Sequence, residues 1–235
     1  MARTVNKEEY AAKRDEILSV AQRLVYTKGY ERMTVQDILH EIGMSSGAFY
    51  HYFETKPAVL EALVEKIQEE AEQPLLPVVH DPELSAVDKL RGYFATMERS
   101  RDMQKAFIAQ LVRIWFADEN SIVREKVHEA IIRRRSPLLT AIITQGIREG
   151  VFSTPHPAQT SEVILVLARG MGDTLAKLML SIDREGDDQS TLENIAATYA
   201  VYADAVERVL GAARPFLVRP DLSTVRGWFE TGDRS

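Results

Sequence analysis

The sequence predicts an all-α fold, and three observations predict it. Apolar residues recur at three- and four-residue steps along most of the chain, which is the period of an amphipathic helix. Alternating apolar and polar runs bounded by turn signals, the pattern of strands, are not found. Capping residues, glycines and prolines stand where such helices would begin and end. The 235 residues suffice for one large domain or two small ones with a sizeable core.

The first predicted helix spans Lys7–Lys28, and Gly29 supplies its C-terminal stop. A later helix is expected to begin near Lys56. The first helix has one apolar stripe, made by Ile17, Val20, Ala21 and Leu24. The later helix is expected to bury Leu60, Leu63, Val64 and Ile67.

A short helix between them, Val35–Ile42, is predicted from its start signals. Thr34 can cap its free amides, and Asp37 completes a capping-box-like pair, with Asp in place of the usual Glu or Gln. Met33 and Ile38 stand where a hydrophobic staple would close around the cap. These signals agree on a helix that begins directly after Thr34.

A second short helix, Ser46–Tyr52, follows a glycine-containing turn. Gly43 ends the preceding helix after barely two turns, and Ser45 or Ser46 caps the new one. Two helices this short, joined by such a turn, have the layout of a helix-turn-helix motif.

The chemistry of Ser46–Tyr52 suits a DNA groove. Gly47 has no side chain, so the backbone there can approach DNA closely and offer its amide. The next helix opens at Thr55-Lys56-Pro57, and its free amides beside Lys56 make a phosphate clamp. The aromatic residues at helical spacing, Phe49, Tyr52 and Phe53, are expected to face the core. The groups left facing outward are Ser46, Gly47, Tyr50 and His51.

The charge of the whole chain does not by itself support DNA binding. The formal net charge is −6, and residues 1–56 hold eight basic and eight acidic side chains. The other 21 basic and 27 acidic side chains therefore carry all of the excess, which opposes non-specific binding to nucleic acid. The prediction of DNA binding rests on local arrangement.

The run from Gly29 to Lys56 closely resembles the signature of the TetR/AcrR (tetracycline-repressor) family of transcriptional regulators. Its letters are Gly29-Tyr30-x-x-Met33-Thr34-Val35-x-Asp37-Ile38, then Gly43-Met44-Ser45-Ser46-Gly47-Ala48-Phe49-Tyr50-His51-Tyr52-Phe53-x-x-Lys56. The resemblance as a whole covers about fifty residues of the chain, and the spacing from Thr34 to Lys56 has no gap. Leu39-His40 and Pro57 depart from the family pattern, away from the expected DNA face.

The resemblance implies a role for each matching residue. Thr34 would bind phosphate at the start of the first motif helix, and Lys56 would clamp the backbone from outside. Tyr50 and His51 would grip phosphates. The tip of the recognition helix would consist of Ser45, Ser46, Gly47 and Ala48. Ser46, Ala48 or His51 would reach base edges, and DNA shape would supply much of the specificity.

Further helices are predicted beyond a connection marked by Pro74, Pro77 and Pro82. Pro137 is expected to kink or divide one of them. The charged segment Asp183–Gln189 is expected to be a loop, and the part from Arg214 reads equally as an ordered appendage or a loose end. The expected helices are Ser85–Ser100, Gln104–Phe116, Ser121–Arg148, Thr160–Leu180 and Thr191–Gly211.

We divide the chain into a helix-turn-helix DNA-binding domain (1–56), a larger helical domain (57–214) and a tail (215–235). The resemblance implies that the larger domain binds a ligand and forms a dimer. Thr160–Leu180, with Gly170 and Gly172 for close approach, and Thr191–Gly211 would form a four-helix interface with a second copy. The alternative is that both helices complete the core of one chain. The apolar positions of the second helix are Leu192, Ile195, Tyr199, Tyr202, Val206 and Val209.

A ligand pocket would be mostly apolar with a few convergent polar groups. Candidate ligand-binding residues are Phe94, Met97, Phe107, Gln110, Arg113, Trp115, Met171 and Thr174, with Tyr93 and Leu138 beside them and Arg169 or Asp173 as further charged anchors. Ordinary core packing is the alternative for each of them. The run Arg133-Arg134-Arg135 is interpreted as a solvated face.

Membrane and enzyme functions find no support in the sequence. The most apolar stretch, Val163–Leu180, is interrupted by three charged residues, and the N-terminus lacks the apolar core of a secretory signal. The chain has no cysteine, which excludes disulfides, a thiolate zinc site and a cysteine nucleophile and fits a reducing cytoplasm. Phosphate-binding, dinucleotide, zinc-protease and hydrolase motifs are missing too, so we expect no catalytic residue, metal or cofactor.

Together these observations predict a cytoplasmic, nucleoid-associated homodimer that binds a palindromic operator. The resemblance implies that a small molecule of unknown identity releases this repressor from its DNA. The alternative is a DNA-binding protein of the same fold without a small-molecule effector, with an architectural role or under the control of a protein partner.

Overall fold

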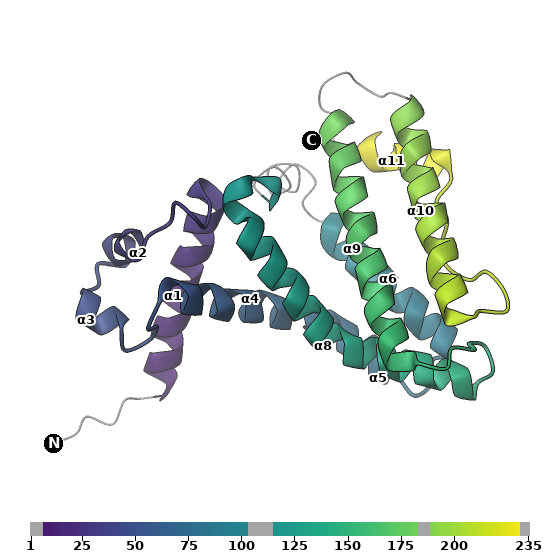
Figure 1. The fold of residues 1–235 in the computed structure, drawn as a ribbon, viewed down its shortest axis with the longest axis horizontal. Helices are drawn as coiled ribbons and strands as arrows, with labels where there is room; N and C mark the ends of the chain where they lie inside the picture. The colour runs from purple at the N-terminus through teal and green to yellow at the C-terminus, as the bar shows by residue number, and fades with distance from the viewer. Residues whose placement is uncertain (1–6, 103–114, 183–188, 231–235) are drawn as a thin grey trace. The chain divides into compact units, whose positions relative to one another are not determined.

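The computed structural model describes residues 7–102, 115–182 and 189–230, and within them every regular element is a helix (Figure 1). This confirms the all-α prediction, with a helix-turn-helix at the N-terminus and a larger helical part after it. Within these residues no helix combines the length and the apolar character needed to cross a bilayer.

The described residues fall into two compact units. The first comprises those of Met1–Glu70 and Arg113–Ala130, and the second those of Ala71–Val112 and Ile131–Ser235. α4 (Lys56–Glu72) is one continuous helix across the predicted domain boundary after residue 56. The division of the chain at that position remains a prediction.

The first unit is built on α1 (Lys7–Lys28), α2 (Val35–Ile42) and α3 (Ser46–Phe49). The predicted bounds of α1 and α2 are confirmed, whereas α3 was expected to reach Tyr52 and is shorter. The amide of Tyr52 donates to Phe49 O at 2.8 Å, three residues back, so the helix tightens into turns. The fully buried side chains of the unit include Ile17, Ala21, Ile38, Phe49 and Val59.

The predicted connection is helical around Pro74 and Pro77, whereas Pro82 lies in the non-helical stretch 81–85. The helical part forms a 3₁₀ turn, η1 (Gln73–Leu75), followed by α5 (Leu76–His80). Pro74 and Pro77 stand in the first turns of these two elements, where a missing N–H costs nothing. In α4, Leu60, Leu63 and Val64 are buried as predicted, and Ile67 is half-buried.

The second unit contains α6 (Ala86–Asp102), most of α8 (Ser121–Arg148), α9 (Pro157–Ile182) and α10 (Gln189–Leu210). The predicted bounds of α8 are confirmed, and Pro137 does not divide it. The predicted helix Gln104–Phe116 and the predicted loop Asp183–Gln189 lie outside the described residues, apart from Trp115, Phe116 and Gln189. The 3₁₀ turn η2 (Asp118–Asn120) precedes α8.

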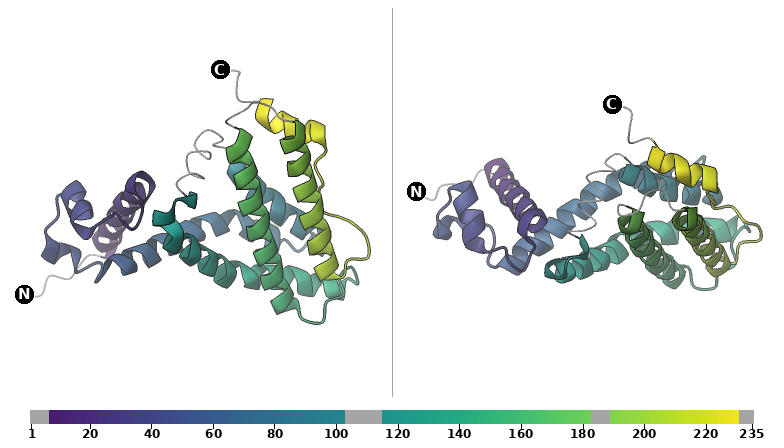
Figure 2. Two further views of the ribbon diagram at one scale, coloured as in Figure 1. Left: turned by 45° about the horizontal axis from the view of Figure 1, so that its top comes forward. Right: turned by 90° about the horizontal axis from the view of Figure 1, so that it is seen from above.

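Helices α9 and α10 lie side by side (Figure 2). A Cβ at Gly170 of α9 would lie 2.9 Å from the hydroxyl of Tyr202 on α10, so glycine allows this close approach. Leu192, Ile195 and Val206 of α10 are buried within the single chain. These three residues therefore pack in the core of the single chain, and an interface of the two helices with a second copy remains a prediction.

The tail is an ordered appendage up to Glu230. Its helix α11 (Leu222–Glu230) inserts Val225 into a small core with Leu175, Leu192 and Ile195. The segment before α11 is held by Glu207, whose Oε1 accepts hydrogen bonds from the amides of Phe216 at 2.6 Å and Leu217 at 2.7 Å. The Arg219 guanidinium binds Glu207 as well.

Candidate nucleic-acid interface

The start of α2 is fixed by a complete capping box, as predicted. The Thr34 hydroxyl accepts a hydrogen bond from the amide of Asp37 at 3.1 Å, and the Thr34 amide donates to Asp37 Oδ2 at 2.7 Å. The same hydroxyl donates to Asp37 Oδ2 at 2.6 Å. Met33 and Ile38, the predicted staple, are both buried. The Thr34 side chain is thus engaged in holding the helix start.

Asp37 also binds Lys28, whose Nζ lies 2.6 Å from Oδ2. The hydrogen bonds from Lys28 and Thr34 lower the pKa of this carboxyl to about 2. The carboxylate is therefore ionised at neutral pH, and the charge of Lys28 is compensated within the protein.

The turn between α2 and α3 has the geometry that the sequence predicts. Gly43 ends α2 with φ of 68°, in the left-handed region that favours glycine. Ser45, one of the two predicted caps, accepts a hydrogen bond at Oγ from the amide of Ala48 at 3.3 Å.

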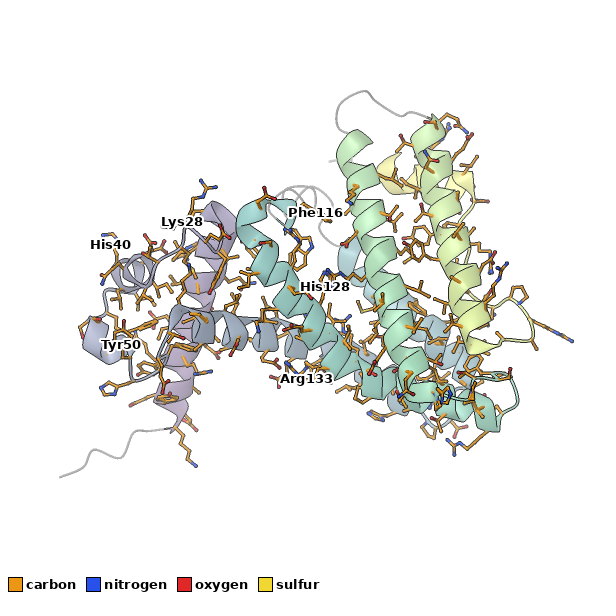
Figure 3. All side chains as sticks on the ribbon, viewed as in Figure 1. Lys28, His40, Tyr50, Phe116, His128 and Arg133 are labelled. Carbon is orange, nitrogen blue, oxygen red and sulfur yellow. The ribbon has the colours of Figure 1, made fainter. Side chains whose placement is uncertain are left out.

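The predicted polar groups lie on the outer face of α3 and of the turn that follows it. Ser46, Gly47, Tyr50 and His51 are exposed, and the Tyr50 ring is 53% exposed (Figure 3). A Cβ at Gly47 would meet no atom within 4 Å, so packing within the protein gives no reason for a glycine there. Ser45 is exposed and Ala48 is half-buried.

The turn that follows α3 is held by aromatic and cationic contacts from α1 that the sequence reasoning missed. Tyr10 stacks on Tyr52 with ring centroids 4.8 Å apart, and its hydroxyl donates to His51 O at 3.2 Å. The Arg14 guanidinium lies 4.3 Å from the centroid of the Phe53 ring. Tyr10 and Arg14 extend the predicted α1 stripe by further four- and three-residue steps, which is the signal that would have found them.

Lys56 lies at the start of α4 over the ring of Tyr30. Its Nζ is 4.3 Å from the ring centroid and donates to Glu31 O at 3.2 Å. Burial lowers the pKa of Lys56, although Glu31 and Asp37 oppose the shift. The neighbouring Thr55 hydroxyl caps α4 by accepting from the Ala58 amide at 3.2 Å. The ammonium group is thus held beside the free amides of a helix start.

A further contact that the sequence did not reveal is a hydrogen bond between Tyr30 and Asn120. The amide of Tyr30 donates to Oδ1 of the buried Asn120 at 2.8 Å. The backbone just before η2 is held by Arg124, which donates to Ala117 O at 2.9 Å and also to Trp115 O. The turn that precedes α2 therefore rests on the segment that begins α8.

The candidate ligand residues that the structure describes do not form one group. Phe94 and Met97 pack against the main core of the second unit, whereas Met171 packs against the smaller core around Val225. Trp115 contacts His128 in the first unit, and the Thr174 hydroxyl donates to Gly170 O at 2.9 Å within α9. The described part of the chain brings together no three side chains suited to hold a metal ion. Outside the described residues lie Phe107, Gln110 and Arg113.

The arginine run on α8 is not a solvated face, so that interpretation is wrong. Arg133 is exposed (Figure 3), but Arg134 Nε donates to Glu72 Oε2 at 2.8 Å. Arg135 is only 5% exposed. Because a helix turns by about 100° per residue, three consecutive side chains point in different directions, and one of them faces the interior.

Two comparisons with protein families cover separate parts of the chain. Residues 17–63 match the family described as bacterial regulatory proteins, tetR family. Residues 110–185 match the tetracyclin repressor-like C-terminal domain.

Individual relatives extend the likeness to most of the chain. An uncharacterised HTH-type transcriptional regulator of Bacillus subtilis, YfiR, is 27% identical over 204 residues, which are 85% of this chain and 95% of that protein. The HTH-type transcriptional repressor NemR of Escherichia coli is 22% identical over 84% of this chain and 100% of its own length. The crystal structure of a TetR-family transcriptional regulator from Pectobacterium atrosepticum, 17% identical, has a TM-score of 0.57 and covers 89% of this chain and 99% of its own; it supports the fold alone.

Proposed function

We propose that this chain, which belongs to the tetR family of bacterial regulatory proteins, binds a palindromic operator as a homodimer and releases it when a small molecule binds. DNA binding and transcription regulation follow from the family, whose members are usually repressors. The palindrome, the dimer and the ligand response are our proposal. The division of the chain into DNA-binding residues 1–56, ligand-binding and dimerisation residues 57–214 and a tail, 215–235, is also part of our proposal.

The observation that carries the proposal is the outer face of α3 and of the turn that follows it. Gly47 has open space around it, so the protein gains nothing from lacking a Cβ there. Close approach by another molecule is a physical reason for it. The exposed Tyr50 ring and the exposed His51 imidazole beside it offer donors that suit phosphates and base edges.

The other proposed contacts divide into phosphate binding and base reading. Because the Thr34 hydroxyl already donates to Asp37, its part in phosphate binding would come from the amides at the start of α2. Lys56 has donors beyond the one that Glu31 O accepts, and these would reach the DNA backbone. Base edges would be read from the tip of α3, by Ser46, Ala48 or His51, with Ser45 holding that tip in place.

The dimer would use α9 and α10, which lie side by side (Figure 1). Val163 and Val166 on α9 and Val201 on α10 are 45%, 55% and 65% exposed. Large apolar side chains exposed on two packed helices mark a surface for association. A four-helix arrangement with a second copy would cover them and place two recognition helices on two half-sites.

Ligand response requires a difference in affinity between two states. The small molecule must bind better to the dimer whose DNA-binding units have the wrong spacing for the operator than to the dimer that fits it. A ligand with equal affinity for both states would shift nothing.

The test begins with selection of double-stranded DNA from a random pool by the purified protein. We expect enrichment of one palindromic sequence; failure to enrich any sequence would contradict the proposal. Binding of that operator is then compared between the wild type and Gly47→Ala. Since alanine favours helix and has room here, we expect an equal or higher melting temperature for the variant.

Operator affinity of Gly47→Ala should nevertheless fall by about tenfold or more, because the new methyl group separates the backbone from the DNA. Gly227→Ala serves as the control, since a Cβ there also meets no atom within 4 Å and α11 has no proposed DNA contact. Equal losses in the two variants would show that Gly47 has no special place at the DNA.

A further inference from the structure

A buried phenol on α6 lacks a hydrogen-bond acceptor. Tyr93 is 2% exposed, and its hydroxyl donates to no acceptor within the part of the chain that the structure describes. Burial raises the pKa of Tyr93 to about 12, so the hydroxyl keeps its proton at neutral pH and is a donor without an acceptor. An unsatisfied buried donor destabilises a protein, and where one is retained its partner is often an ion or a ligand.

A buried positive charge lies close to this hydroxyl. Arg135 of α8 is 5% exposed, and its Nη1 donates to Met97 Sδ at 3.0 Å. The positive charge of Arg135 lowers the pKa of Tyr93, whereas burial raises it. This effect of the charge indicates that the guanidinium and the phenol lie close together. Two kinds of donor, a phenol and a guanidinium, therefore meet in the interior of the second unit.

The surroundings of the pair are apolar and partly accessible. Tyr93 belongs to the main core of this unit, and several half-buried apolar side chains from the same stretches of α6 and α8 pack against that core. They are Phe94, Met97, Ile131, Ile132 and Leu138. Such a boundary can hold an apolar body while the two donors orient its polar end.

We propose that Tyr93 and Arg135 bind the carboxylate of an otherwise apolar small molecule, and that this molecule is the effector. The inference rests on the proposed function, because it names the chemical class of the ligand. A carboxylate accepts two parallel hydrogen bonds from a guanidinium and a further one from a phenol. It would give the Tyr93 hydroxyl its missing acceptor and would accept a hydrogen bond from Nε of Arg135.

The charges around the pair favour one negative charge and not two. The negative charge of Glu72 lies near enough to raise the pKa of Tyr93. Oε2 of Glu72 is also 2.8 Å from Nε of Arg134. A phosphate monoester carries up to two negative charges, so this carboxylate would repel it more strongly than it repels a monocarboxylate. Placing its additional polar oxygens among apolar side chains would also cost free energy. The site therefore suits a monocarboxylate.

The inference is tested by thermal unfolding of the full chain with octanoate, decanoate, benzoate and cinnamate, each compared with its primary amide. A ligand that binds the folded state raises the melting temperature. We expect at least one carboxylate to raise it more than the matching amide does, since the amide has the same shape without the charge. Equal shifts within every pair, or no shift with any carboxylate, would overturn the proposal.

Two variants and a control identify the site. Tyr93→Phe should leave the melting temperature of the free protein unchanged or higher, because it removes an unsatisfied hydroxyl, and should weaken carboxylate binding by about tenfold. Arg135→Met should abolish the preference for carboxylate over amide. The control Arg133→Met changes an exposed arginine two residues away and should bind as the wild type does. Unchanged binding by Tyr93→Phe would contradict the assignment even if Arg135→Met failed to fold.

Operator binding separates this inference from the proposed function. If the free protein binds its operator and carboxylates neither stabilise it nor release the DNA, the ligand class is wrong and the regulator stands. If no operator is found while carboxylates bind through Tyr93 and Arg135, the site stands and the proposed function is wrong. Loss of operator binding on adding the stabilising carboxylate, and not its amide, is the result we expect.

Discussion

At the scale of single residues, the interface divides into side chains that hold the backbone and side chains that face solvent. Thr34, Asp37 and Ser45 form the caps of two short helices. Tyr50 and His51 contribute little to the core, since both are exposed. Substitutions in the first group should act mainly through stability, and those in the second through DNA affinity.

Replacement of Lys56 by alanine should weaken binding to operator and to unrelated DNA alike. A phosphate contact carries no sequence information, and each one lost lowers the salt dependence of binding by about one counterion. The measurement is operator affinity as a function of salt concentration. Because Lys56 also contacts Tyr30, the melting temperature of the variant must be measured as well. Unchanged affinity and slope at matched salt would contradict the phosphate clamp.

Asp37 predicts a pH dependence with a defined sign. Its pKa is lowered from an ordinary value of 3.8 to about 2 in the folded protein. The carboxylate therefore contributes stability that is present above about pH 4 and is lost as the pH falls towards about 2. Urea unfolding of the wild type and Asp37→Asn should show a difference that shrinks across this range. A difference that is constant with pH would contradict a role for the ionised group.

At the scale of helices, one carboxylate of α10 holds the backbone that leads to α11. Burial tends to raise the pKa of Glu207, but hydrogen bonds from Arg219 and from the amides of Leu217 and Phe216 lower it overall. Glu207 therefore stays ionised and accepts hydrogen bonds from the backbone amides of the segment that precedes α11. Arg91 of α6 fixes the same segment by donating from Nε to Phe216 O at 2.8 Å.

Glu207→Ala should destabilise the protein by about 2–3 kcal/mol, because two backbone amides and a guanidinium lose a charged acceptor. Denaturant unfolding measures the loss, and hydrogen exchange should rise at Phe216 and Leu217. Glu193→Ala is the matched control on the same helix, since Glu193 is exposed and its Oε1 accepts a hydrogen bond from the side-chain Nε2 of Gln189 at 2.9 Å. Similar losses in both variants would refute the anchoring role.

At the scale of the whole molecule, the proposal depends on association of two copies. Val166→Glu combined with Val201→Glu places charge on the exposed apolar surface of α9 and α10. We expect a monomer in mass measurements at micromolar concentration and a large loss of operator affinity, because one copy reaches only one half-site.

Val218→Glu provides the control for this change. Val218 is 74% exposed but lies in the segment before α11, away from both helices in sequence. The variant should dimerise as the wild type does. A wild type that is monomeric, or a double variant that remains dimeric, would rule out this surface as the interface.

Local patterns in the sequence determined the helices and much of the candidate interface. The bounds of α1, α2 and α8 follow from apolar periodicity and capping residues, which act over three or four positions. The capping box of Thr34 and the outward face around Gly47 and Tyr50 follow for the same reason.

Only the tertiary structure decided which of these features meet. The bond between Tyr30 and Asn120 joins positions 90 residues apart, and Arg91 reaches Phe216 across 125. Such contacts leave no local period, because their geometry depends on how distant helices pack. The same holds for Arg135, which stands in a charged run that reads as surface but is buried beside Tyr93. Sequence thus determined where helices begin and end, and packing determined which charges lie inside.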